Sequence, residues 1–113
     1  MILARDSDQE ELAITLRLFN RLYNHRFARP VIIFHENISK AQQENLRASI
    51  PIPTRHLISF EQIAFCLPPF LTRSVPERDQ SAWNRPIGYR HMIRFYSGML
   101  FAHPALEAFD FMW

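Results

Sequence analysis

Two residue types are nearly absent from this 113-residue sequence, which contains only two glycines and one cysteine. A single cysteine excludes an internal disulfide framework and a zinc site built from several cysteines. Cys66 lies in the apolar run 63–67, where a small buried residue is the default expectation. Both glycines, Gly88 and Gly98, fall within one stretch of eleven residues. That stretch is therefore unusual in backbone freedom as well as in composition.

An excess of charge and long apolar runs are also missing. The chain has 13 Lys and Arg against 11 Asp and Glu, and its formal net charge is +2. Nucleic-acid-binding modules usually carry a clear basic excess on one face, so dispersed arginines disfavour that class. No apolar segment approaches the roughly 18–20 residues that a membrane span needs, and no charged-then-apolar leader opens the chain. We therefore expect no nucleic-acid partner and no membrane span in this chain.

The composition that remains is that of one small folded domain. Hydrophobic residues make up 48% of the chain, with ten phenylalanines, so disorder is excluded. Residues 1–4 are short and apolar, which predicts a buried strand. Ser7 and Glu10 have the spacing of a capping box. A helix is therefore expected to begin there and to run to about residue 24.

A second strand and a second helix follow. Residues 30–34 are a continuous β-branched and aromatic run, typical of a strand that is buried on both faces of a parallel sheet. Ser39 and Gln42 form another capping-box pair, which predicts a helix to about residue 50 with one exposed face. Strand, helix, strand and helix in short succession predict an α/β fold with parallel strands.

Prolines set the pattern of the second half. Pro51 and Pro53 interrupt the alternation, and residues 58–65 are expected to form a strand that leads into a short helix. Further prolines predict an extended loop over residues 68–86. Loops of this length are usually functional or disordered.

Two more helices are expected near the end of the chain. Pro86 and Pro104 fit the first turns of helices to about residues 102 and 108, and residues 109–113 then predict the start of another strand. The expected organisation is one partial domain over residues 1–113. Its parts are a strand–helix–strand–helix half at 1–50, a proline-rich connection at 51–86, and a helix with the next strand at 87–113.

The glycine-containing stretch carries the candidate functional residues. Residues 88–98 read GYRHMIRFYSG. In a helix, Arg90, Arg94 and Ser97 share a face with Phe101, and two arginines on one face need an anionic neighbour. That neighbour is either a ligand phosphate or a loop carboxylate, and both interpretations stay open. Gly98 is expected to let another backbone approach closely.

The two histidines of this region have structural explanations that need no ligand. His91 is more readily explained as a core or capping residue than as a ligand. His103, directly before a proline, is more readily explained as a helix-entry residue than as a metal ligand.

The composite motif resembles the central motif of the fungal α-1,2-mannosyltransferases, which are retaining, GDP-mannose-dependent enzymes of the secretory pathway. The shared pattern is Tyr-Arg-His-Met-x-Arg-Phe-x-Ser-Gly, five variable residues, His-Pro-x-Leu and a closing aromatic-Trp. Residues 3–6, which read LARD, resemble the first strand of that family. The likeness is strong over residues 89–113 and weaker elsewhere. Ile93 and Tyr96 depart from the Cys and Asn that are common in the family.

The resemblance implies a Rossmann-like nucleotide-diphospho-sugar transferase fold of the GT-A type, truncated after its first strand–helix units. In such enzymes the end of the first strand lies against the nucleotide, and the tyrosine of the motif lies in the donor and acceptor region. The alternative for Arg5 is a surface pair with Asp6 or Asp8. The nucleotide-sugar-binding residues implied by the resemblance are Ala4, Arg5, Tyr89, Arg90, Arg94 and Ser97.

The resemblance also implies partners and a cofactor. These are GDP-mannose as donor, a mannose-terminated glycan as acceptor, Mn²⁺, and a Golgi membrane location for a longer parent. In the family the acidic metal motif and the catalytic carboxylates follow the closing Trp, so no catalytic residue and no metal ligand is assigned here. We expect the isolated chain to be inactive and an open sheet edge to permit self-association. The alternatives are a small non-catalytic interaction module and a degenerate truncated gene product.

Overall fold

The computed structural model describes residues 1–112. These residues divide into two compact units, Met1–Ile63 and Ala64–Met112. The first unit contains a sheet with helices, and the second contains a long loop followed by a helix.

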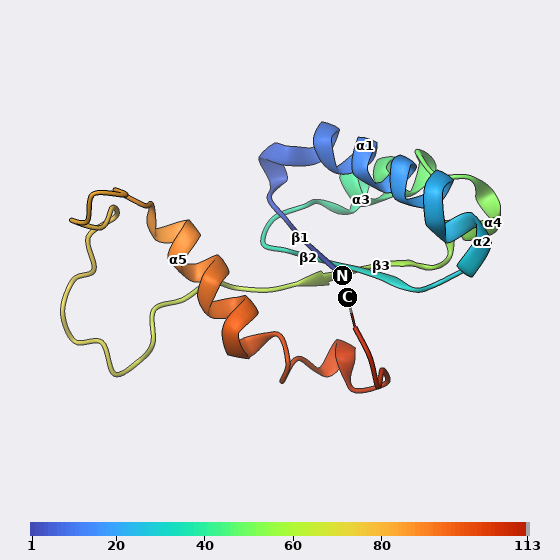
Figure 1. The fold of residues 1–113 in the computed structure, drawn as a ribbon. Helices are drawn as coiled ribbons and strands as arrows, with labels where there is room; N and C mark the ends of the chain where they lie inside the picture. Colours follow the sequence, from blue (N-terminus) through green and yellow to red (C-terminus); the bar gives the residue numbers. More distant parts are fainter. Residues whose placement is uncertain (113) are drawn as a thin grey trace. The chain divides into compact units, whose positions relative to one another are not determined.

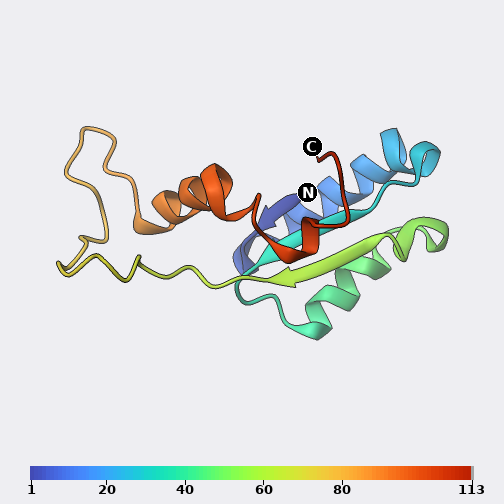
Figure 2. The same cartoon turned by 90° about the horizontal axis from the view of Figure 1, so that it is seen from below.

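The sheet of the first unit has three parallel strands, in the order β1-β2-β3 (Figures 1 and 2). They are β1 (Ile2–Ala4), β2 (Val31–His35) and β3 (Ile58–Gln62). The prediction of an α/β fold with parallel strands is therefore confirmed. Read as β3-β2-β1, the order is also that of the first half of a doubly wound sheet.

The helices of the first unit lie on one side of this sheet (Figure 1). Right-handed crossovers that advance in one direction place successive helices on the same face, which explains the arrangement. The first connection contains a 3₁₀ turn and three further helical segments, and the second contains two short helices. The segments are α1 (Gln9–Phe19), the π-helix η2 (Asn20–Asn24), α2 (His25–Phe27), α3 (Lys40–Ala48) and α4 (Ile52–Arg55).

The core of this unit forms between the sheet and the apolar faces of α1 and α3. Ile33 of β2 is fully buried, and Leu16 of α1 and Leu46 of α3 belong to the same cluster. Side chains alternate along a strand, so Ile32 and Phe34 point to the opposite face, where both are also buried. Burial on both faces explains why the sequence of β2 is continuously apolar, as predicted.

The two expected capping boxes differ in outcome. At α3 the capping box is confirmed, because the Gln42 N–H donates to Ser39 Oγ and the Ser39 N–H donates to Gln42 Oε1. At α1 the prediction is wrong: a 3₁₀ turn, η1 (Asp6–Asp8), precedes the helix, and Asp8 is the N-cap. The Ser7 hydroxyl instead donates to the carboxylate of Asp8 at 2.7 Å.

Buried polar side chains fix the connection between α2 and β2. Ala28 adopts a left-handed conformation with φ of 47° and ends the helical segment. The amide of Asn24 then binds the main chain of Arg29 twice, at 2.7 and 2.9 Å. Asn20 accepts a hydrogen bond from Thr54 of α4. The Asn24 contacts fix the turn that precedes β2, and the Asn20 contact joins the helical segment to α4.

The second unit begins with the predicted loop. Over residues 64–86 the only strand-like pairing is an isolated antiparallel bridge between Arg78 and Pro86. The short helix expected after β3 is wrong, because residues 63–68 are irregular. Cys66 is exposed rather than buried.

A helix with a π-helical end follows the loop. The segments are α5 (Ile87–Arg94), the π-helix η3 (Phe95–Met99) and the 3₁₀ turn η4 (Pro104–Leu106), with Pro86 as the N-cap of α5. Residues 109–112 form no strand, so that prediction is wrong for the described residues, and Trp113 lies outside them. A side chain at Gly98 would meet no atom within 4 Å among the described residues, so the expected close approach is also wrong. Within residues 1–112, no helix is long and apolar enough to cross a membrane.

Candidate functional site

The carboxyl ends of the three parallel strands define one edge of the sheet, and open α/β sheets bind ligands at this edge. β1 ends at Ala4, β2 at His35, and β3 at Gln62. The side chain of Ala4 belongs to the hydrophobic core. Ala4 therefore offers only its main chain to a ligand at this edge.

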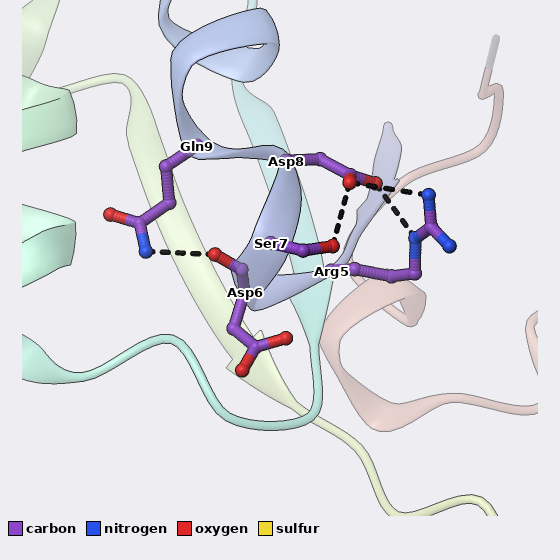
Figure 3. Close-up of polar contacts among 5 residues, drawn as sticks. All are labelled: Arg5, Asp6, Ser7, Asp8 and Gln9. Atoms are coloured by element: carbon purple, nitrogen blue, oxygen red, sulfur yellow. Dashed lines mark hydrogen bonds and ion pairs between the residues drawn. The ribbon is translucent and has the colours of Figure 1, made fainter.

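Arg5 lies just beyond β1 and forms a forked pair with Asp8 (Figure 3). Its Nε donates to Asp8 Oδ2 at 2.8 Å, and its Nη2 donates to Asp8 Oδ1 at 3.2 Å. Asp6 is not the partner; its carbonyl accepts from the side chain of Gln9. The Arg5 side chain is 77% exposed, so its remaining donors face solvent.

The ion pair between Arg5 and Asp8 is electrostatically favourable, but a ligand can displace it. Hydrogen bonds from Arg5 and Ser7 hold the pKa of the Asp8 carboxyl below its usual value. The hydrogen bond and charge of Asp8 raise the pKa of Arg5. Exposed ion pairs contribute little net stability, because water and salt compete with them. A phosphate that approaches Arg5 can therefore bind the Nη1 side of the guanidinium or replace Asp8.

A cavity of about 380 Å³ lies at the ends of β2 and β3. The first turn of α3 forms part of its wall, and a helix N-terminus favours a negative charge. The basic side chain of Lys40 adds to this preference. The cavity is lined by His35, Asn37, Ile38, Ser39, Lys40, Gln43, Phe60 and Gln62.

His35 gives this cavity a neutral polar wall. It is 3% exposed, its Nδ1 accepts the Ile38 N–H at 3.1 Å, and its Nε2 lies 3.2 Å from the amide nitrogen of Gln43. Burial lowers the pKa of His35, and the charge of Glu61 opposes this effect only in part. The ring is therefore neutral near pH 7, and its two nitrogens are already occupied by Ile38 and Gln43.

The arginines predicted in the second unit bind the loop main chain. Arg90 Nη2 donates to the carbonyls of Pro76 and Glu77, and Arg94 Nη1 donates to the carbonyl of Cys66 at 2.7 Å. The Nε of Arg90 is buried and has no hydrogen-bond partner among residues 1–112. Both arginines thus connect α5 to the loop through carbonyls rather than through loop carboxylates.

The expected shared face does not extend to Ser97. The helix changes to a π-helical turn at Phe95, where the Leu100 N–H donates to the Phe95 carbonyl five residues earlier. This wider turn shifts the angular position of every following side chain relative to an α-helix. Ser97 and Phe101, both exposed, therefore leave the face that carries Arg94.

The histidines of this region have structural roles, as expected. The ring of His91 stacks on Phe65 with centroids 5.5 Å apart, and Phe65 meets Phe95 edge to face. His103 is the N-cap of η4, because its Nδ1 accepts the Ala105 N–H at 3.2 Å.

Tyr89 belongs to a cluster that sequence reasoning missed. Arg85 Nη1 donates to the Tyr89 hydroxyl at 2.6 Å, and the guanidinium carbon lies 4.4 Å from the centre of the Tyr89 ring. The same carbon lies 5.4 Å from the Trp83 ring. The spacing of four residues between Arg85 and Tyr89 was the one available signal, although Arg85 was expected in a loop. For the cavity wall, the signal was the position of His35 and Asn37 directly after a buried strand.

The carboxylates of the described residues do not fit a metal ion. Across residues 1–112, no three His, Cys, Asp or Glu side chains are grouped closely enough to hold one. Asp8 is paired with Arg5, and Asp79 accepts hydrogen bonds from Ser81. The Mn²⁺ that the sequence resemblance implies therefore has no set of ligands here.

Comparison with known proteins agrees with the motif of residues 88–113. No curated protein and no solved structure matches the chain. The family model described as glycolipid 2-alpha-mannosyltransferase matches residues 1–113, which is the whole chain. The resemblance to α-1,2-mannosyltransferases is thereby confirmed, and the chain belongs to the glycolipid 2-alpha-mannosyltransferase family.

Proposed function

We propose that this chain is the nucleotide-sugar-binding part of a mannosyltransferase that transfers mannose from GDP-mannose to a mannose-terminated glycan with retention. Family membership over residues 1–113 supports the mannosyl chemistry. The observation that carries the donor assignment is the parallel sheet with Arg5 and a 380 Å³ cavity at its carboxyl edge. The strand order is compatible with a fold of the GT-A type, and the proposal includes a Golgi membrane location for the parent protein.

Each group at the carboxyl ends of the strands has a role in binding the donor. The fork of Arg5 binds the donor diphosphate, because guanidinium geometry matches phosphate oxygens. The first turn of α3 and Lys40 favour the same negative charge. Asn37 and Gln62 of the cavity wall offer uncharged polar groups to the nucleoside. Within the second unit, the family resemblance makes Tyr89 a candidate sugar-binding residue, and Arg90 and Arg94 hold the loop that precedes α5.

The proposal separates binding from transfer. In the reaction the bond between mannose C1 and the phosphate oxygen breaks, GDP leaves with the proton of the acceptor hydroxyl, and the acceptor oxygen forms the new bond to C1. A divalent cation would neutralise charge on the leaving diphosphate, but residues 1–112 offer no set of ligands for one. We assign no metal ligand and no catalytic carboxylate to residues 1–112. The chain alone is then expected to bind GDP and to transfer no mannose.

Saturation-transfer NMR with GDP and GDP-mannose tests the donor site. Arg5→Ala should weaken GDP binding about tenfold, the loss of one charge-assisted contact. Arg17→Ala removes another exposed arginine, from α1, and should leave binding unchanged. Absence of any GDP signal, or equal losses in the two variants, would contradict the donor site. Mannose transfer by the 113-residue chain would contradict the separation of binding from transfer.

We also propose self-association through the outer side of β1. Among residues 1–112, β1 pairs with β2 on one side only, and an open strand edge can pair with another chain. Sedimentation velocity over a range of concentrations should detect a dimer, and Leu3→Lys should reduce it, because edge lysines oppose strand pairing. A concentration-independent monomer would show that the edge is protected.

A further inference from the structure

Trp83 is held outward by a turn with many internal hydrogen bonds. The side chain is 75% exposed although indole is among the most apolar groups of the chain. The Asp79 N–H donates to the Arg85 carbonyl at 3.0 Å, and the Asn84 N–H donates to the Ser81 carbonyl at 3.0 Å. Exposure of Trp83 is thus a property of a closed turn rather than of a loose segment.

Side chains complete this turn. Asp79 accepts hydrogen bonds from the N–H and the hydroxyl of Ser81, and Ser81 Oγ accepts the Trp83 N–H at 3.3 Å. Arg78 donates to the carbonyl of Asn84, whose φ of 44° is left-handed. A non-glycine residue keeps such a conformation only when its surroundings impose it. The turn therefore fixes where the indole of Trp83 points.

Arg85 connects this indole to the motif tyrosine. Its guanidinium lies over the Trp83 ring and over the Tyr89 ring, and it donates to the Tyr89 hydroxyl. A planar cation over one face of an indole occupies that face and leaves the other accessible. The exposure of Trp83 is consistent with one covered and one open face.

We propose that the open face of Trp83 is a stacking platform for a pyranose ring of the glycan acceptor. This rests on the proposed function, because the mannosyltransferase family supplies the sugar and Arg85 joins Trp83 to the motif residue Tyr89. The apolar C–H face of a hexopyranose packs against the electron-rich face of an aromatic ring. A guanine base of the donor is the competing occupant.

Fluorescence titration distinguishes these occupants. Trp113→Phe leaves Trp83 as the only tryptophan of the chain, so its emission reports on this turn alone. α-1,2-Mannobiose should change the emission saturably, and GDP should not. No saturable change with mannobiose, or a change with GDP alone, overturns the platform.

Substitutions then measure the contribution of the ring. Trp83→Ala should weaken mannobiose binding about tenfold in saturation-transfer NMR, and Trp83→Tyr should retain most of it. Phe70→Ala is the matched control, because Phe70 is 78% exposed in the same long loop. Equal binding by Trp83→Ala and the parent chain, or an equal loss in Phe70→Ala, overturns the proposal.

The two proposals fail separately in these measurements. Loss of mannobiose binding in Trp83→Ala with intact GDP binding supports the platform. Mannobiose binding that needs Trp83 in a chain that does not bind GDP keeps the platform and contradicts the donor site.

Discussion

The two units of this chain share the same kinds of interaction in different proportions, because arginines also donate to carbonyls in the first unit and apolar side chains are also buried in the second. In Met1–Ile63, apolar side chains of the sheet and helices form one core around Ile33. In Ala64–Met112, arginine side chains reach main-chain carbonyls and aromatic rings, as at Arg85, Arg90 and Arg94. Apolar packing depends on a periodic pattern in the sequence, whereas the arginine contacts depend on where a loop passes. The first unit is accordingly predictable from its sequence, and the second is largely not.

The comparison predicts that the largest single loss of stability comes from the core of the first unit. Ile33→Ala removes a side chain with no exposed surface and should lower the free energy of unfolding by about 2–5 kcal/mol. Urea unfolding followed by circular dichroism measures this change. Ile14→Ala, at a residue that is 43% exposed, should cost much less. Equal effects would mean that Ile33 is not central to the core.

An arginine substitution tests the second unit. Arg90→Ala removes hydrogen bonds to the carbonyls of Pro76 and Glu77 and should destabilise the junction between loop and α5 by about 1–3 kcal/mol. The readout is hydrogen exchange of the Ile87 N–H, which donates to the Glu77 carbonyl. Arg73→Ala changes an exposed arginine of the same loop. Unchanged exchange at Ile87 would show that Arg90 does not hold the junction.

Two serines sharpen the comparison within the first unit. Ser39→Ala removes the cap of α3 and should cost about 1 kcal/mol. Ser7→Ala should cost distinctly less, because the Ser7 hydroxyl binds Asp8 and caps no helix. Thermal unfolding of both variants decides the point. A larger loss of stability in Ser7→Ala than in Ser39→Ala would instead support the capping box that the sequence predicts between Ser7 and Glu10.

The strand β2 and the two serines show which features a sequence can predict and which it cannot. Residues 31–35 were identifiable as a doubly buried parallel strand because burial on both faces leaves a continuous apolar run. Ser7 and Ser39 have the same local spacing, but Arg5 draws Asp8 into a pair and a 3₁₀ turn forms there. Spacing alone cannot reveal that competition.

Some residues of the candidate site were predictable from the sequence, and others were visible only in the structure. The end of β1 and the motif residues were identified through family resemblance and strand position. The cavity beside α3 and the contact between Trp83 and Arg85 depend on the path of the chain in space. The π-helical turn at Phe95 also invalidated a face that had been inferred from α-helical spacing.

The smallest expected effect is a pH dependence of the free energy of unfolding, which arises from His35 in the first unit. Burial lowers the pKa of His35 in the folded chain below its ordinary value of 6.5. Below pH 6.5 the unfolded chain therefore binds a proton that the folded chain resists, and the free energy of unfolding should fall as the pH decreases. The loss begins near pH 6.5 and ends once the folded-state pKa has been passed. Asp8 and Asp79 also have lowered pKa values, but from an ordinary value of 3.8, so their losses come at more acidic pH.

Urea unfolding at intervals between pH 7.5 and 5 should therefore show a slope that His35→Gln reduces. The α-amino group of Met1 contributes to the rest of the slope, because burial lowers its pKa from the ordinary value of 8.0. Glutamine keeps a polar side chain near Ile38 and Gln43 but has no titratable group in this range. His56→Gln is the matched control, because His56 is exposed. If the slope is unchanged in His35→Gln and falls in His56→Gln, the titrating group lies outside the cavity at the sheet edge. The neutral state assigned to His35 in the cavity wall would then lose its support.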